Sequence, residues 1–193
     1  DANTTGSSNT ALGYAALSSN TTASNNVAVG LSALNANTTG AGNTGVGFNS
    51  LLANTTGNYN AALGHKALDS NTTGDSNTGI GNRALQSNTT ANNNTAVGTN
   101  ALDQNSTGAQ LTAIGAQALY SSDGGDNNIA IGYQAGYSVT TGTGNIFIGD
   151  NAGNNTNHDT ENDKLVIANS NTTSPLIAGD FSTPSLTVNG DLG

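Results

Sequence analysis

The side chains best suited to catalysis in this chain are its two histidines, His65 and His158. A histidine acts as a general acid or base when a nucleophile and an orienting group stand beside it. Neither histidine lies in a motif that supplies such partners, and the chain contains no cysteine. We therefore predict that the protein is not an enzyme and has no catalytic residue.

Acidic residues gather in two short segments that suggest cation binding. One is Asp123-Gly-Gly-Asp126, and the other is the alternating run of Asp159, Glu161 and Asp163. Neither segment has the spacing of an EF-hand loop, which needs a glycine at its sixth position and a closing glutamate. We expect solvated loops here, with no metal site and no cofactor.

The charge balance excludes one class of partner. The net charge is -9 and only three residues are Lys or Arg, whereas nucleic-acid binding needs a basic surface. No apolar run approaches the roughly 20 residues that span a bilayer, so we expect no membrane insertion in this segment. The amino end has no initiator Met and no signal-peptide pattern, and we expect a fragment or a processed chain.

Internal repetition dominates the sequence. A glycine recurs at a constant interval without interruption: Gly13, Gly30, Gly47, Gly64, Gly81, Gly98, Gly115, Gly132 and Gly149. Counted from the asparagine of a recurrent Asn-Thr-Thr, the unit is N-T-T-[GA]-x-x-N-[TVI]-[AG]-[LVI]-G-x-x-A-L-x-x, and nine copies cover residues 3–155. Its positions are numbered one to seventeen below. Position seven is asparagine in every copy except the one with Leu111: Asn9, Asn26, Asn43, Asn60, Asn77, Asn94, Asn128 and Asn145.

The repeat length indicates the fold. Helical repeats need roughly 33 residues. The much shorter unit seen here suits one coil of a β-solenoid, with Gly and Asn at the tight corners. We predict an all-β, parallel β-solenoid of nine coils, with one strand at positions seven to eleven and a second at the Ala-Leu pair of positions fourteen and fifteen. Stacked coils would align the asparagines into amide ladders. At about 4.8 Å per coil the rod would be roughly 43 Å long.

The apolar positions suggest how the coils pack. We predict that position ten, which is always Leu, Val or Ile, lies inside every coil, and that the glycine of position eleven lies at a corner. The small residue of position nine would then face outward and let another backbone approach. One coil has few apolar side chains to offset roughly 17–30 kcal/mol of ordering entropy. We therefore expect a homo-oligomer and favour threefold symmetry.

The Asn-Thr-Thr segments are also N-glycosylation sequons. Seven lie in the repeats, at Asn3, Asn20, Asn37, Asn54, Asn71, Asn88 and Asn105. Two interpretations stay open: glycans along one edge of the rod, or a corner motif selected for side-chain hydrogen bonds, which we favour. The threonine columns also raise ice binding. We hold this as a weaker alternative, because adjacent threonines on a strand point to opposite faces and leave one outward hydroxyl per coil.

Three tyrosines are candidates for contact with cell-surface glycans. Tyr120 and Tyr137 share position sixteen in neighbouring copies, and Tyr133 lies nearby at position twelve. Stacked tyrosines bind sugars, but more often they pack against each other or against another subunit. Positions five, six, twelve, thirteen and sixteen vary between copies, so we expect any recognition to be shallow, weak and multivalent.

Several segments resemble known surface proteins. Asn26-Val-Ala-Val-Gly30 and Asn128-Ile-Ala-Ile-Gly132 resemble the head repeats of trimeric autotransporter adhesins, which form a left-handed parallel β-roll. The fuller unit, Asn9-Thr-Ala-Leu-Gly-Tyr-Ala-Ala-Leu17 followed by Asn20-Thr-Thr, more closely resembles bacterial surface and phage tail-fibre-domain proteins that often precede an endosialidase-type chaperone domain. The resemblance implies a left-handed homotrimeric fibre, extracellular, on a cell surface or a virion.

The repeat period ends near residue 155. We expect residues 156–193 to form a β-rich capping and transition segment, with strands at Lys164–Ala168 and Leu186–Val188. The predicted function is a structural fibre segment, a shaft or a head, of an adhesin or tail-fibre-like protein. The alternative is a self-assembling extracellular filament or matrix subunit, and ice binding is less favoured.

Overall fold

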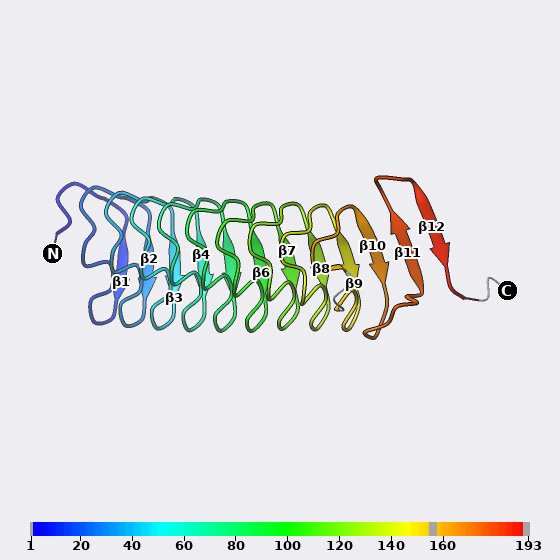
Figure 1. The fold of residues 1–193 in the computed structure, drawn as a ribbon. Helices are drawn as coiled ribbons and strands as arrows, with labels where there is room; N and C mark the ends of the chain where they lie inside the picture. Colours follow the sequence, from blue (N-terminus) through cyan, green and yellow to red (C-terminus); the bar gives the residue numbers. More distant parts are fainter. Residues whose placement is uncertain (1, 155–157, 191–193) are drawn as a thin grey trace.

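The fold is a rod of stacked coils. A computed structural model describes residues 2–154 and 158–190 of the chain. Each repeat contributes one three-residue strand at positions eight to ten, and the strands lie side by side along the rod (Figure 1). The nine are β1 (Thr10–Leu12), β2 (Val27–Val29), β3 (Thr44–Val46), β4 (Ala61–Leu63), β5 (Thr78–Ile80), β6 (Thr95–Val97), β7 (Thr112–Ile114), β8 (Ile129–Ile131) and β9 (Ile146–Ile148).

The strands pair in parallel, and each residue pairs with its equivalent in the next repeat. Val29 of β2, for example, pairs with Val46 of β3. The same register holds from β1 to β9, and the described residues contain no α-helix. The predicted all-β parallel β-solenoid, with one repeat per coil, is therefore confirmed.

The predicted second strand is absent from the described coils. Positions twelve to seventeen form turns, because positions thirteen and fifteen hold the left-handed backbone conformation. Leu34 and Leu85, both at position fifteen, have φ values of 51° and 54°. This segment still bonds to the next coil, since the Leu34 N–H donates to the Ser50 carbonyl oxygen at 3.0 Å. Each coil thus contains one short strand followed by a series of turns that hydrogen-bond to the next coil.

The glycine of position eleven ends each strand at a corner, as predicted. Gly64 has a φ of 140°, a conformation that a side chain disfavours. A Cβ atom at Gly64 would also lie 2.5 Å from the Gly81 carbonyl oxygen of the next coil. Backbone conformation and close stacking therefore both require glycine here.

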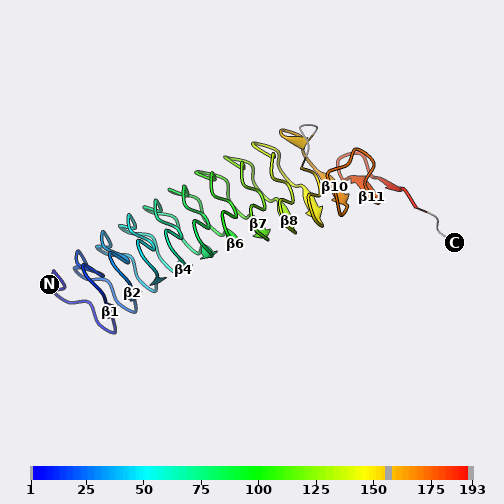
Figure 2. The ribbon, with the colours of Figure 1, turned by 90° about the horizontal axis from the view of Figure 1, so that it is seen from below.

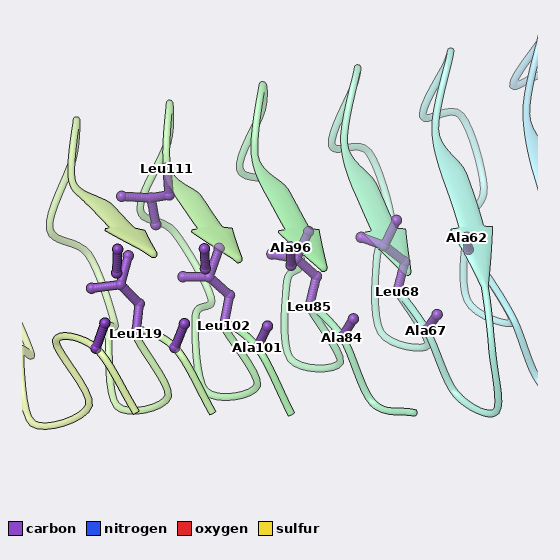
Figure 3. Close-up of a cluster of buried hydrophobic side chains, with 14 of the residues drawn as sticks. Ala62, Ala67, Leu68, Ala84, Leu85, Ala96, Ala101, Leu102, Leu111 and Leu119 are labelled. Atoms are coloured by element: carbon purple, nitrogen blue, oxygen red, sulfur yellow. The ribbon is translucent and has the colours of Figure 1, made fainter. Parts of the chain in front are cut away.

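The interior contradicts the prediction for positions nine and ten. Position nine points inward, and Ala28 and Ala96 are fully buried, whereas position ten points outward and Leu63 is 51% exposed. The interior is filled by the leucines of position fifteen and the alanines of position fourteen (Figure 3). These leucines leave room for only a small residue on the inward side of most strands. A Cβ atom at Gly45, at position nine, would lie 3.0 Å from Ser50 Oγ and in van der Waals contact with Leu34 Cγ at 3.4 Å.

This arrangement also overturns the argument that position nine admits a neighbouring chain. Its side chain faces the interior of its own coil. The face of the strand that points to solvent is instead the one that carries positions eight and ten. In Figure 2 the strands form one side of the rod and the turns form the other.

The parallel stack of strands continues beyond β9 for one further strand. Strand β10 (Lys164–Ile167) pairs in parallel with β9, with Leu165 opposite Ile146, so this turn of the solenoid is two positions longer than a repeat. The chain then turns back into β11 (Ile177–Asp180) and β12 (Ser185–Val188), which pair antiparallel and extend the sheet (Figure 1). The two strands predicted in this region are confirmed. Residues 156, 157 and 191–193 of the predicted segment lie outside the described residues, and its capping role stays a prediction.

Candidate functional site

The outward face of the sheet is the most extensive candidate surface. We call it the outer stripe, and it comprises positions eight and ten of β1–β9 with the same-face residues of β10–β12. Residues directly opposite each other on paired strands share a face, so Ile167 continues the column of Ile148, and Ile177 and Val188 follow. Its members are Thr10, Leu12, Val27, Val29, Thr44, Val46, Ala61, Leu63, Thr78, Ile80, Thr95, Val97, Thr112, Ile114, Ile129, Ile131, Ile146, Ile148, Leu165, Ile167, Ile177, Gly179, Leu186 and Val188.

The outer stripe carries no charged residue, although the chain has a net charge of -9. Large apolar side chains on it are open to solvent; Leu12 is 68% exposed and Ile131 40%. Position twelve widens it with exposed Tyr14, Leu31 and Phe48. Twelve strands at about 4.8 Å and a strand length of about 10 Å give roughly 600 Å² of sheet face, threonine hydroxyls included. This area lies at the upper end of the roughly 300–600 Å² of the largest apolar patch on an ordinary monomer.

The asparagines of position seven form a buried ladder through the rod. The side chain of Asn60 is typical: its Oδ1 accepts the backbone N–H of Asn77 at 2.9 Å, and its Nδ2 donates to the Gly74 carbonyl oxygen at 2.8 Å. The Asn side chains from Asn26 to Asn94 repeat this pattern from coil to coil. These residues hold coils together and are closed to an external ligand.

The asparagines of position one form a second ladder, which decides how the sequons can be used. Asn54 Nδ2 donates to Asn37 Oδ1 at 2.8 Å and to the Gly57 carbonyl oxygen at 3.0 Å. Six sequon asparagines are buried, namely Asn20, Asn37, Asn54, Asn71, Asn88 and Asn105. Of the seven candidates only Asn3, in the first coil, is exposed. A glycan on any of the six would prevent closure of its coil.

Two exposed sequons were not among the predicted sites. Asn93, followed by Asn94 and Thr95, lies at position six of its coil and is exposed. Asn171, followed by Thr172 and Thr173, lies between β10 and β11 and is exposed. The Asn-x-Thr pattern itself was the available signal. Asn93 directly precedes the position-seven asparagine Asn94 within a repeat, whereas Asn171 lies outside the repeats.

The threonine columns split into two kinds. At position two the hydroxyl donates to the next coil, as from Thr38 Oγ1 to the Thr55 carbonyl oxygen at 3.0 Å. At position three the threonines are exposed, in one column along the corner: Thr22, Thr39, Thr56, Thr73, Thr90 and Thr107. On the outer stripe, threonine at position eight is interrupted by Val27, Ala61 and Ile129. The hydroxyls therefore form no broad continuous array.

Position five was predicted to be free for contact with partners. In the structure, several of its side chains instead hydrogen-bond to the backbone of the preceding coil. Asn58 Oδ1 accepts the backbone N–H of Ala41 at 2.9 Å, and Asp126 Oδ1 accepts that of Ala109 at 2.7 Å. Asp123 likewise accepts the N–H of Ser106 at 3.2 Å. The two carboxylates of the Asp123–Asp126 segment thus secure the preceding coil. The signal was present in the sequence, because position five carries a side-chain oxygen in Ser7, Ser24, Asn58, Asp75, Asn92, Asp126 and Thr143.

The histidines make contacts that a structural role explains. The His65 ring stacks on Phe48 with centroids 5.2 Å apart, and its Nδ1 lies 3.1 Å from Asn82 Nδ2. His158 Nδ1 lies 2.7 Å from Glu161 Oε2. Each histidine therefore contacts residues close to it in the stack, and the structure does not bring the two into one site.

The tyrosine candidates separate in the same way. Tyr120 and Tyr137 stack nearly parallel, with centroids 5.0 Å apart, and both are half-buried. Tyr133 lies at position twelve and is 50% exposed. The facing sides of Tyr120 and Tyr137 are closed to a sugar ring.

Two ion pairs stand out among the charged side chains. Arg83 contacts the buried Asp103 at 3.2 Å, and Lys164 contacts Asp180 at 2.7 Å across β10 and β11. The hydrogen bond from the Lys164 ammonium holds the pKa of Asp180 well below its usual range. Burial raises the pKa of Asp69, against smaller opposing effects of Lys66 and Gln86.

Two kinds of site are absent from the described residues. They contain no group of three or more His, Cys, Asp or Glu side chains arranged to hold a metal ion. They also contain no helix long and apolar enough to cross a membrane.

Comparison with known proteins adds no assignment. No protein-family model matches the chain, and neither a curated protein nor a solved structure matches it.

Proposed function

We propose that this chain is a structural segment of an extracellular fibre and that its copies associate through the outer stripe. The observation that carries the proposal is a solvent-facing, uncharged face that runs across all twelve strands. It is apolar at position ten throughout and at position eight from β8 onward. Leaving roughly 600 Å² of such surface in water is unfavourable, and with exposed side chains of position twelve the area approaches the roughly 800 Å² that one partner buries in a stable protein interface.

A second copy suits this surface better than an unrelated partner. The side chains of the outer stripe repeat at the strand spacing of about 4.8 Å over roughly 58 Å. A partner must offer the same period over the same length to pack its side chains between them. Another copy of the chain does so by construction.

We extend the proposal to three copies wound as left-handed solenoids, as the resemblance to surface fibres implies. The outer stripe is narrow, with two main columns of side chains. Narrow stripes meet well around a threefold axis, where each chain makes the same closed contact. The corners stay outside, and their exposed positions, such as Tyr133 and the threonines of position three, would make weak multivalent contacts with cell-surface glycans. The fibre performs no catalysis in this proposal.

Sedimentation equilibrium of the purified chain tests this function. We expect a discrete trimer, and a Val46→Asp and Ile80→Asp double variant should sediment as a folded monomer. Thr39→Asp and Thr73→Asp, on the exposed corner, form the matched control and should remain trimeric. A wild-type chain that stays monomeric at tens of micromolar would refute the proposal.

One observation favours the filament alternative. Strand β12 runs in the same direction as β1–β10, since β11 reverses the chain and β12 reverses it again. Its free edge could therefore pair in parallel with β1 of another copy, end to end. Electron microscopy separates the alternatives: particles of one length support the shaft, and indefinite polymers support the filament. An ice-recrystallisation assay on the same sample tests the weaker ice-binding alternative.

A further inference from the structure

The outer stripe is not uniform along the rod. In β1–β7, position eight is threonine in five strands, with Val27 and Ala61 in the other two. From β8 onward this column becomes apolar, with Ile129, Ile146 and Leu165 in succession. Position ten stays apolar throughout. Both columns are therefore apolar only toward the carboxyl end of the rod, apart from Gly179.

The last strands also lack cover within their own chain. All four residues of β12 are exposed, and Leu186 is 66% exposed. Two apolar hollows open beside this part of the sheet, of about 370 and 420 Å³. Leu165, Phe181 and Leu186 line the first, and Ile148, Ile167 and Leu176 line the second. A sheet extension of this kind is marginally stable until an apolar face is covered.

We infer that the segment from β8 to β12 anchors self-association and sets the copies parallel and in register. This inference rests on the proposed function, because it names the part of the outer stripe that holds the copies together. Parallel alignment packs Ile129 and Ile146 of one copy against the same residues of the next. Antiparallel alignment would place Ile129 and Ile146 against the threonine-rich strands near the amino end. It would also cover β11 and β12 with those less apolar strands.

The anchoring role is tested with substitutions that the fold already accepts. Ile129→Thr with Ile146→Thr installs the residue that β5, β6 and β7 carry at the same position. Coil structure should survive, as circular dichroism and the unfolding midpoint will show. Self-association should weaken about tenfold or more, since two apolar contacts are lost per copy. Val27→Thr at the amino end is the control, and its dissociation constant should change less than threefold.

Orientation is tested with single cysteines, which the chain naturally lacks. A Thr10→Cys variant should form a disulfide between copies under mild oxidation if the copies are parallel and in register. In an antiparallel assembly Thr10 would lie near β12 of its partner. A mixture of Thr10→Cys and Ser185→Cys chains would then cross-link while neither variant cross-links alone.

The outcomes separate the inference from the function it rests on. An oligomer that loses affinity equally with the carboxyl-end and amino-end substitutions overturns the anchor and leaves the fibre proposal standing. Cross-linking only in the Thr10→Cys and Ser185→Cys mixture overturns the parallel alignment and the threefold arrangement, and leaves self-association through the outer stripe standing. A wild-type monomer overturns both. Selective weakening together with Thr10→Cys self-linking supports the inference.

Discussion

The ring of Phe147 fills the space that a side chain at Gly153 would need. Phe147 occupies position nine of the last full coil, where other coils carry Ala or Gly, and it is fully buried. Position fifteen changes in compensation, from leucine to Gly136 and Gly153. A Cβ atom at Gly136 would lie 2.9 Å from Phe147 Cδ2, and one at Gly153 would overlap the ring.

The first prediction concerns the large residue at position nine, Phe147, and the glycine that replaces leucine at position fifteen, Gly153. Gly153→Leu restores the residue of seven other coils but should destabilise the protein by about 1–3 kcal/mol, because it overpacks against Phe147. Backbone strain is not the cause, since the leucines of position fifteen already adopt φ values of 49–54°. Adding Phe147→Ala should recover part of the loss, as urea unfolding of both variants will measure. Additive destabilisation would contradict the size exchange.

The second prediction concerns the position-seven ladder. Asn60→Ala removes the acceptor of the Asn77 N–H and the donor to the Gly74 carbonyl, both buried. We expect a loss of roughly 2–4 kcal/mol in the free energy of unfolding. The control is Thr39→Ala on the exposed corner, which should change it by less than about 0.5 kcal/mol. Equal effects of the two substitutions would argue against the ladder as a source of stability.

The repeat period was sufficient to predict the parallel solenoid, because the short, constant and uninterrupted spacing of its glycines admits few other folds. It could not assign the two faces of the strand. Alternation shows that positions nine and ten point in opposite directions, and the usual rule places the larger residue inside. Here the interior is already filled by leucines such as Leu68, so only Ala62 or a similarly small residue fits opposite them (Figure 3).

The candidate surface was missed for the same reason. With position ten assigned to the interior, the sequence offered no outer stripe to predict. The second strand was also wrong, because nothing in an Ala-Leu pair signals a left-handed φ at a buried leucine. The conformation follows from the packing of the closed coil, which a local pattern does not contain.

The third prediction is a pH dependence centred on Lys164 and Asp180. The pKa of Asp180 is lowered in the folded protein. Its ionised carboxylate therefore stabilises the fold above pH 3.8, the unfolded pKa, and this stabilisation is lost as the pH falls through the folded pKa. The pKa of Lys164 is raised in the folded protein. Its ammonium group therefore stabilises the fold below pH 10.5, the unfolded pKa, and this stabilisation is lost as the pH rises through the folded pKa. Lys164→Gln should therefore be less stable than wild type near neutral pH in urea unfolding, with the difference shrinking in strong acid. Asp150→Asn, a substitution of an exposed carboxylate on the last coil, should show no such trend.

The fourth prediction concerns glycosylation. If the chain is secreted from a eukaryotic cell, folded protein should carry no glycan on Asn37, Asn54 or the other buried sequons, because their amides are enclosed in the position-one ladder. Asn3, Asn93 and Asn171 are exposed and should be modified. Site-resolved mass spectrometry checks this. Glycans found on Asn54 of well-folded material would show that the coil is not closed as described.

The uniform register of the coils has a consequence for length. Each coil bonds only to the coils on either side, and its columns offer the same groups to both neighbours. Removing or duplicating one whole repeat among the regular coils therefore keeps the backbone register and the asparagine ladders intact, whereas removing a single residue moves each later side chain out of its column. The length of the rod can therefore change only in steps of about 4.8 Å, the spacing of neighbouring strands. Gene-level duplication of whole repeats would lengthen it while its two ends stay the same.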